Sequence, residues 1–212
     1  MTLINYIDSR ALQLGSPNDY VLKQSLKIDV IAARAKMIRN QFTATKTFPQ
    51  SAIVALKCLA LTKVPSTDCC SVDLGCNILK STSKIPRPIE VKDTVNFNYV
   101  GSVDSKSEWG WIKPEEVRFI KHRKWSSKDI FYTWLNDYIY VFNDLSPKKF
   151  TIRYPVADLI EAEALKNCDG EPCISIDYEI EIEDHWINDI DKIILPNYRN
   201  VQDQQIKVDE VE

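Results

Sequence analysis

The feature that most constrains the fold is a helical stretch near the start of the chain, which strand-forming segments follow. From Asp19 to about Phe42 the chain contains no Gly or Pro. Its apolar residues recur three or four positions apart, the spacing that places them on one face of an α-helix. Ser16, Pro17 and Asp19 predict the start of this helix, with Ser16 as the N-cap and Pro17 at the first helical position. The apolar stripe consists of Leu22, Leu26, Val30, Ala33 and Met37, widened by Ile31, Ala35, Ile38 and Phe42.

Short apolar and β-branched segments after residue 49 predict strands. The clearest pair flanks Asn136-Asp137, two residues that tolerate the positive φ angles of a tight hairpin turn. A third strand follows this hairpin at short spacing, so a meander is expected. A Pro-first helix is expected from Pro114 to about Trp125. The expected strands cover residues 51–64, 76–81, 96–103, 130–135, 138–142 and 149–154.

The last quarter of the chain is more ambiguous. Residues 158–165 fit either a helix or a strand. Residues 174–182 alternate strictly between apolar and polar side chains, the pattern of a half-buried strand. A helix is expected over residues 183–195, and Pro196 is expected to end it. The polar residues that follow, 197–212, predict an extended arm that orders on a partner.

These elements predict an α+β protein with an N-terminal amphipathic helix, a mostly antiparallel β core, a C-terminal helix and an extended acidic arm. We expect a helical segment over 1–48, a core domain over 49–195 and the arm over 196–212. An apolar content of 44% and an aromatic content of 10% are those of a folded protein. We expect no membrane span, because no run of about 18 apolar residues occurs, and no signal peptide at the N-terminus.

Positive and negative charges are segregated along the chain. Residues 1–155 contain 23 Lys+Arg and 14 Asp+Glu, a balance of +9, whereas residues 156–212 contain 4 and 16, a balance of −12; together they give the net −3. Such asymmetry bears on partners and assembly more than on fold. Two interpretations stay open: the acidic segment neutralises the basic body of its own chain, or it meets the basic face of a neighbouring copy, head to tail. Head-to-tail contacts close into rings when the rotation permits.

The predicted long helix carries a basic face opposite its apolar stripe, with Lys23, Lys27, Arg34 and Arg39 among its members. Such a face suits nucleic acid, an anionic membrane or an acidic partner, or is simply solvated. We favour the acidic partner, because the chain itself supplies an acidic segment. The alternative is a nucleic-acid-binding module that uses residues 19–42.

No catalytic pattern stands out. The five glycines do not form a phosphate-binding loop, and no nucleophile elbow occurs. The six cysteines, at 58, 69, 70, 76, 168 and 173, lack the spacing of a zinc knuckle. We expect reduced thiols, with a disulfide or a zinc site as the alternatives. We therefore expect no enzyme, no metal and no cofactor; the opposing hypothesis is a small intracellular enzyme or regulator with a pocket near His122 or the cysteines.

Several segments resemble ring or connector proteins of tailed phages, most closely those of crAss-like phages that infect gut Bacteroidetes. The resemblance spans roughly residues 49–195, and its motifs are strand and turn residues of modest specificity. They are CNILKS at 76–81, KIP at 84–86, YVGSVD at 99–104, NDYIYV at 136–141 and the later strand at 150–154.

This resemblance implies a virion structural protein made in the host bacterial cytoplasm. It implies a homo-oligomeric ring, commonly a dodecamer, that lies between the portal and the tail around the DNA channel. The portal and neighbouring ring or tail proteins would be its partners, and DNA would be passing cargo. Combined with the charge pattern, it predicts that a basic receiver on one copy accepts the acidic C-terminal stretch of another. The expected interface residues are Lys23, Lys27, Arg34 and Arg39 on the basic side, and Asp177, Glu179, Glu181, Asp209, Glu210 and Glu212 on the acidic side.

Overall fold

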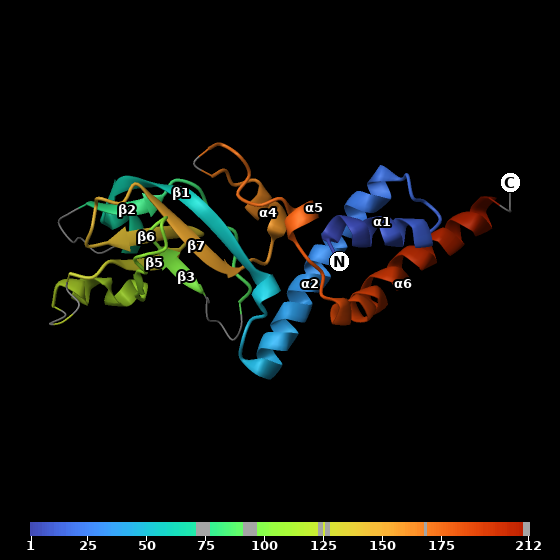
Figure 1. The fold of residues 1–212 in the computed structure, drawn as a ribbon, viewed down its shortest axis with the longest axis horizontal. Helices are drawn as coiled ribbons and strands as arrows, with labels where there is room; N and C mark the ends of the chain where they lie inside the picture. Colours follow the sequence, from blue (N-terminus) through green and yellow to red (C-terminus); the bar gives the residue numbers. More distant parts are fainter. Residues whose placement is uncertain (71–76, 91–96, 123–124, 126–127, 168, 210–212) are drawn as a thin grey trace.

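A computed structural model describes residues 1–70, 77–90, 97–122, 125, 128–167 and 169–209. The molecule is elongated, with a β-sheet at one end and three helices, α1, α2 and α6, at the other (Figure 1). The α+β prediction is confirmed. The helices are α1 (Leu3–Gln13), α2 (Tyr20–Thr45), α3 (Thr67–Cys70), α4 (Leu159–Glu163), α5 (Ile176–Glu179) and α6 (Asp184–Asp209), with 3-10 helices η1 (Gln50–Ala52) and η2 (Pro114–His122). The strands are β1 (Ile53–Pro65), β2 (Asn77–Ser81), β3 (Tyr99–Gly101), β4 (Gly110–Trp111), β5 (Phe131–Leu135), β6 (Tyr138–Phe142) and β7 (Lys149–Pro155).

The long strand β1 organises the sheet, whose order is β3-β7-β1-β2-β6-β5-β4. The first part of β1 pairs with β7, and the part from Leu61 onward pairs with β2. A register shift between Leu56 and Leu59 interrupts the pairing of β1 with β7, and Cys58 within it has a φ of 61°. Such a bulge bends a strand and increases its twist. All of these pairs are antiparallel except β4 with β5, which is parallel.

The predicted hairpin is confirmed. Strands β5 and β6 pair in register around Asn136 and Asp137, whose φ angles of 52° and 66° are those of a tight turn. The predicted meander is wrong, because β7 does not continue from β6. The second edge of β6 already pairs with β2 through Leu79 and Lys80, so β7 pairs with β1 and β3 instead.

Helix α2 confirms the predicted long helix but begins later than expected. Asp19 is the N-cap, and its carboxylate accepts a hydrogen bond from the Leu22 backbone N–H at 3.0 Å. Ser16 and Pro17 instead lie in the turn that joins α1 to α2, where the Ser16 carbonyl accepts from the Asp19 N–H. The helix ends at Lys46, which has a left-handed φ of 60° and donates its N–H to the Phe42 carbonyl.

The alternating segment at 174–182 is not a continuous strand. Its last residues pair with the N-terminus, where the Leu3 N–H donates to the Ile180 carbonyl and the Ile182 N–H donates to the Met1 carbonyl. The residues before them form the single helical turn α5, closed by the Glu179 N–H on the Ser175 carbonyl at 2.8 Å. This turn buries the isoleucines at 174, 176, 180 and 182 but leaves Tyr178 70% exposed.

The other helical predictions have different outcomes. The Pro-first helix is present as η2, which is described as far as His122; its expected end near Trp125 depends on residues 123–124, which lie outside the described residues. The ambiguous segment contains the short helix α4, which Asp158 caps. Helix α6 does not stop at Pro196, which lies inside it, and the segment expected to be an extended arm is helical as far as Asp209. The last three residues lie outside the described residues, as do parts of the predicted strands at 76–81 and 96–103.

Two hydrophobic cores explain why β6 carries buried side chains on both faces. Ile139 and Val141 belong to a large core that joins one face of the sheet to the helices. Tyr140 and Phe142 belong to a smaller core on the other face, which η2 covers with Val117 and others. The alternation of side chains along a strand places these two pairs on opposite faces. The sheet end therefore has its own core beneath η2.

The position of Pro196 inside α6 leads to a testable prediction. Pro in a helix interior lacks an N–H donor and costs about 3 kcal/mol relative to Ala. We expect Pro196→Ala to raise the free energy of unfolding by about 1–3 kcal/mol and to increase the helical circular-dichroism signal. Pro147→Ala, in a loop, is the matched control and should lower stability by less than about 1 kcal/mol. An unchanged signal in Pro196→Ala would mean that the helix ends at this residue.

Candidate subunit interface

The basic face of α2, which the sequence offered as a receiver for a neighbour, is largely engaged within its own chain. Lys23 pairs with Asp8 at 2.7 Å, and Lys27 pairs with Asp177 at 2.8 Å. Arg39 is exposed, and within the described part of the chain it takes part in no ion pair. Lys27 and Asp177, which the sequence placed on opposite sides of a contact between copies, therefore bind each other inside one copy.

Arg34, the fourth predicted receiver residue, is buried and only 1% exposed. Its guanidinium Nη2 donates to the Ser51 carbonyl at 2.8 Å. Burial lowers the pKa of Arg34 to about 10, while the nearby Glu183 carboxylate acts in the opposite direction. Glu183 also accepts a hydrogen bond from the Ser51 hydroxyl. Arg34 thus joins α2 to η1 and to the start of α6 and is not accessible to a partner.

Another internal ion pair connects the N-terminal and C-terminal helices. The Arg10 guanidinium donates two hydrogen bonds to the Asp191 carboxylate, from Nε to Oδ1 and from Nη2 to Oδ2, each at 2.7 Å. The Tyr6 hydroxyl donates to the same carboxylate at 2.5 Å, and the Arg10 guanidinium lies 4.9 Å from the Tyr6 ring centroid. Bidentate pairs of this kind fix orientation as well as contributing energy. No spacing in the sequence indicates this contact, because 181 residues separate Arg10 from Asp191.

The remaining predicted acidic residues form part of an exposed surface. We define the acidic surface as Tyr178, Glu179, Glu181 and Asp184, at α5 and the start of α6; all four are exposed. The terminal amine lies 3.9 Å from Asp184, a long contact for an ion pair. Asp209 lies at the end of α6, while Glu210 and Glu212 lie outside the described residues.

The opposite end of the molecule carries a surface that the sequence did not single out. We define the basic lobe as Lys113 and helix η2, residues 113–122. Its inner side packs on the smaller core, and its outer side exposes Lys113, Arg118, Phe119 and His122. The first turn of η2 also carries two carboxylates, the exposed Glu115 and the half-buried Glu116. Phe119 is 50% exposed, and the Arg118 guanidinium lies 4.7 Å from its ring centroid. An arginine stacked on an exposed aromatic ring is typical of protein interfaces.

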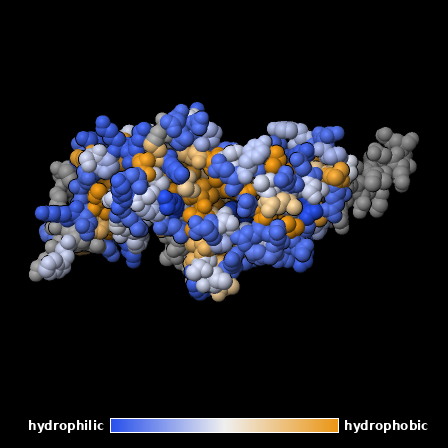
Figure 2. Space-filling model, in the orientation of Figure 1, coloured by the Kyte–Doolittle hydropathy of each residue, from blue (hydrophilic) through white to orange (hydrophobic). Residues whose placement is uncertain are grey.

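The polar surface of the molecule is interrupted by an apolar area in the middle of the face drawn in Figure 2, over the lower part of β1. A groove of about 460 Å³ lies between β1 and the segment that precedes α5. A second groove, of about 740 Å³, lies between α2, α4 and the β5–β6 turn, and is lined by Ile28 and Ile160 among others. At its edge Arg87 lies 3.5 Å from Asp137.

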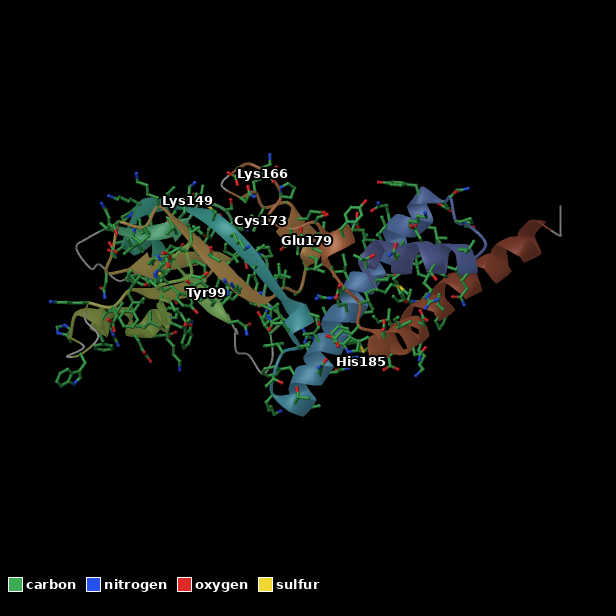
Figure 3. All side chains as sticks on the ribbon, viewed as in Figure 1. Tyr99, Lys149, Lys166, Cys173, Glu179 and His185 are labelled. Carbon is green, nitrogen blue, oxygen red and sulfur yellow. The ribbon has the colours of Figure 1, made fainter. Side chains whose placement is uncertain are left out.

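The histidines and the described free cysteine do not meet in either groove. The Cys173 thiol lies in the smaller groove, where burial raises its pKa and its Sγ donates to the Lys57 carbonyl at 3.8 Å. His185 lies well away from Cys173 (Figure 3), and His122 is on the basic lobe at the far end of the sheet. Among the residues that the structure describes, no cluster of metal-ligating side chains occurs.

Among the cysteines whose side chains the structure describes, the prediction of reduced thiols is wrong for Cys58 and Cys69. Each of them takes part in a disulfide bond, whereas Cys173 is a free thiol. The side chains of the cysteines at 70, 76 and 168 lie outside the described part of the chain. Both bonded residues lie at places where the chain changes direction: Cys58 at the bulge in β1, and Cys69 in the short helix after it. Neither the N-terminal sequence nor the spacing of cysteines along the chain indicates which thiols lie close enough in the fold to form a disulfide.

A comparison with protein families gives one match. The model of the family described as phage tail ring protein 2 matches residues 5–207. A search of curated proteins finds no match. Within the described residues, no helix has both the length and the apolar character that crossing a bilayer requires.

The internal pairing of Lys27 predicts different effects for two residues of the same helix face. Lys27→Glu would place a carboxylate against Asp177, so we expect the free energy of unfolding to fall by about 1–2 kcal/mol. Arg39→Glu should change it by less than about 0.5 kcal/mol. Urea denaturation of both variants measures this difference. Equal effects would contradict the internal pairing.

Buried tyrosines predict a loss of stability in alkali. Burial, together with the Asp191 carboxylate, raises the pKa of Tyr6, and burial, together with Asp29, raises the pKa of Tyr198. Unfolded tyrosine ionises near pH 10. The stabilisation is therefore complete below pH 10, and it is lost above that value at about 1.4 kcal/mol per pH unit for each such tyrosine. Denaturation midpoints from pH 8 to 11 should show this fall, and Tyr6→Phe should reduce its slope. An equal slope in Tyr6→Phe would contradict the assignment.

Proposed function

The chain belongs to the phage tail ring protein 2 family, and from this membership we propose that it is a subunit of a homo-oligomeric ring in the portal-proximal neck of the tail. In this position the ring connects the capsid portal to the tail around the DNA channel. The family match, over residues 5–207, is the observation that carries the proposal. The protein acts as a structural component of the virion, and it is made in the cytoplasm of the host bacterium.

The positions of the basic lobe and the acidic surface support assembly through a contact between two different surfaces. The basic lobe lies at the sheet end, and the acidic surface lies in the half that contains the helices (Figure 1). A contact between unlike faces is heterologous, and a heterologous contact builds a closed ring when the rotation between copies is a simple fraction of a turn. We propose twelve copies, which is the number common to portal-associated rings according to the resemblance described above.

The helical end supports contact with a neighbouring ring or with the portal. Leu12, Tyr20 and Val21 are 66%, 72% and 72% exposed, and they lie at the end of α1 and the start of α2. Helix α6 extends past α1 at the same end of the molecule (Figure 1). Apolar residues gathered at one end are typical of contacts with other proteins. DNA passes through the ring as cargo, because the basic side chains of α2 are largely engaged within the chain.

Light scattering after size-exclusion chromatography tests the proposal. Twelve chains of 24.4 kDa give a particle of about 293 kDa. We expect this particle at low salt, from the protein alone or after addition of the purified portal, and a ring in negative-stain micrographs. About 0.5 M salt reduces the Debye length to about 4 Å and should dissociate part of the particle, which lowers the measured mass. A monomer under all of these conditions would contradict the proposal.

A further inference from the structure

We infer that neighbouring copies bind each other through the basic lobe of one copy and the acidic surface of the next. This inference rests on the proposed ring and names the contact that builds it. The sequence pointed to the basic face of α2 as the receiver. The structure assigns that role to a different element, because Lys23, Lys27 and Arg34 of α2 already bind groups of their own chain.

The basic lobe has the composition of an interface centre. Lys113 immediately precedes η2, and its carbonyl accepts a hydrogen bond from the Glu116 N–H at 2.9 Å. Both Lys113 and Arg118 are exposed. The described residues place no carboxylate within ion-pair distance of either cation. Phe119 exposes half of its surface on an element that the smaller core holds rigid. Arginine and aromatic residues on a rigid element are the types that carry most binding energy in protein interfaces.

The acidic surface offers matching groups. Tyr178 is 70% exposed on α5, although its neighbours Ile176 and Ile180 are buried. Glu179 and Glu181 are exposed on either side of Ile180 and make no ion pair with a lysine or arginine among the described residues. Two carboxylates beside an exposed tyrosine suit a guanidinium stacked on a phenyl ring, because charge and aromatic area are complementary on both sides.

The placement of the two surfaces requires a second copy. Helix η2 lies at the far end of the sheet, whereas α5 lies beside α1 in the helical half (Figure 1). One chain cannot bring its own lobe to its own acidic surface without breaking the large core between them. The contact is therefore between copies and is heterologous, as a closed ring requires. Charge complementarity makes it sensitive to salt and fixes its register.

Charge reversal on each side tests the contact. The lobe variant is Lys113→Glu with Arg118→Glu, and the acidic-surface variant is Glu179→Lys with Glu181→Lys. Each variant alone presents like charges at every contact, so we expect at least a tenfold loss of the ring-sized particle. In an equimolar mixture, an alternating ring with an even number of copies pairs a reversed lobe with a reversed acidic surface at one contact and two unreversed faces at the next, so every contact joins charges of opposite sign. We expect the mixture to recover the particle, which also demonstrates that both variants fold.

A control variant and three possible results separate a failure of this inference from a failure of the proposed function. Lys36→Glu with Arg39→Glu reverses exposed charges on α2 and should leave assembly unchanged. If the wild type forms rings and the two variants also form them, or if the mixture does not recover them, the inference fails while the proposed function stands. If the lobe variant instead keeps its ring but loses binding to a 30-base-pair DNA duplex, the lobe is a nucleic-acid surface and the inference fails. If the wild type forms no ring with or without the portal, the proposed function fails as well.

Discussion

The structure depends on the neutralisation of the acidic C-terminal segment by the N-terminal helices of the same chain. Arg10 binds Asp191 with two hydrogen bonds, Lys27 binds Asp177, and the buried Arg34 lies near Glu183. Backbone hydrogen bonds between the first three residues and residues 180–182 add to these contacts. Together they hold α1, α2, α5 and α6 as one body, although the chain passes through the whole sheet between α2 and α5. Buried and partly buried charges are costly unless they are paired, so removal of one partner would leave the other unsatisfied.

This internal pairing determines what remains for partners. Of the four candidate receiver residues on α2, two are paired within the chain and Arg34 is buried, which leaves Arg39 exposed. Exposed cations beside an exposed aromatic ring lie at the basic lobe, and exposed carboxylates beside an exposed tyrosine lie at α5 and the start of α6. The two interpretations of the charge asymmetry are therefore compatible. One part of the acidic segment neutralises its own chain, and another part is available to a neighbouring copy.

Local patterns predicted those parts of the fold that local interactions determine. The spacing of apolar residues found α2, and Asn136-Asp137 found the β5–β6 turn, because both depend on residues near in sequence. Strand pairing depends on which edges are free, so the partner of β7 could not be read from its short distance to β6. The alternating isoleucines at 174–182 became a turn of helix because the N-terminus, far away in sequence, pairs with residues 180–182. Pro196 was a poor stop signal, because tertiary contacts such as the hydrogen bond from Tyr198 to Asp29, at 2.7 Å, hold the helix beyond it.

The sequence predicted the acidic side of the candidate interface but not the basic side, because exposure and pairing depend on tertiary contacts. Glu179 and Glu181 were found from their place in an acidic stretch, and both are exposed as a contact residue must be. The basic lobe was missed, since a short 3-10 helix has a weak sequence pattern and the exposure of Phe119 follows only from the core beneath η2. Charge counts locate an excess of one sign, but they do not tell which of those charges already have partners within the chain.

The contact between the basic lobe of one copy and the acidic surface of the next is best tested by zero-length cross-linking. The assembled tails are prepared from an equimolar mixture of ¹⁵N-labelled and unlabelled protein. A carbodiimide joins a lysine amine only to a carboxylate in contact with it. The account predicts cross-links between Lys113 and Glu179 or Glu181 in peptides of mixed isotope composition, which identifies two different copies. Cross-links from these two glutamates to Lys36 of α2, with none to Lys113, would contradict it.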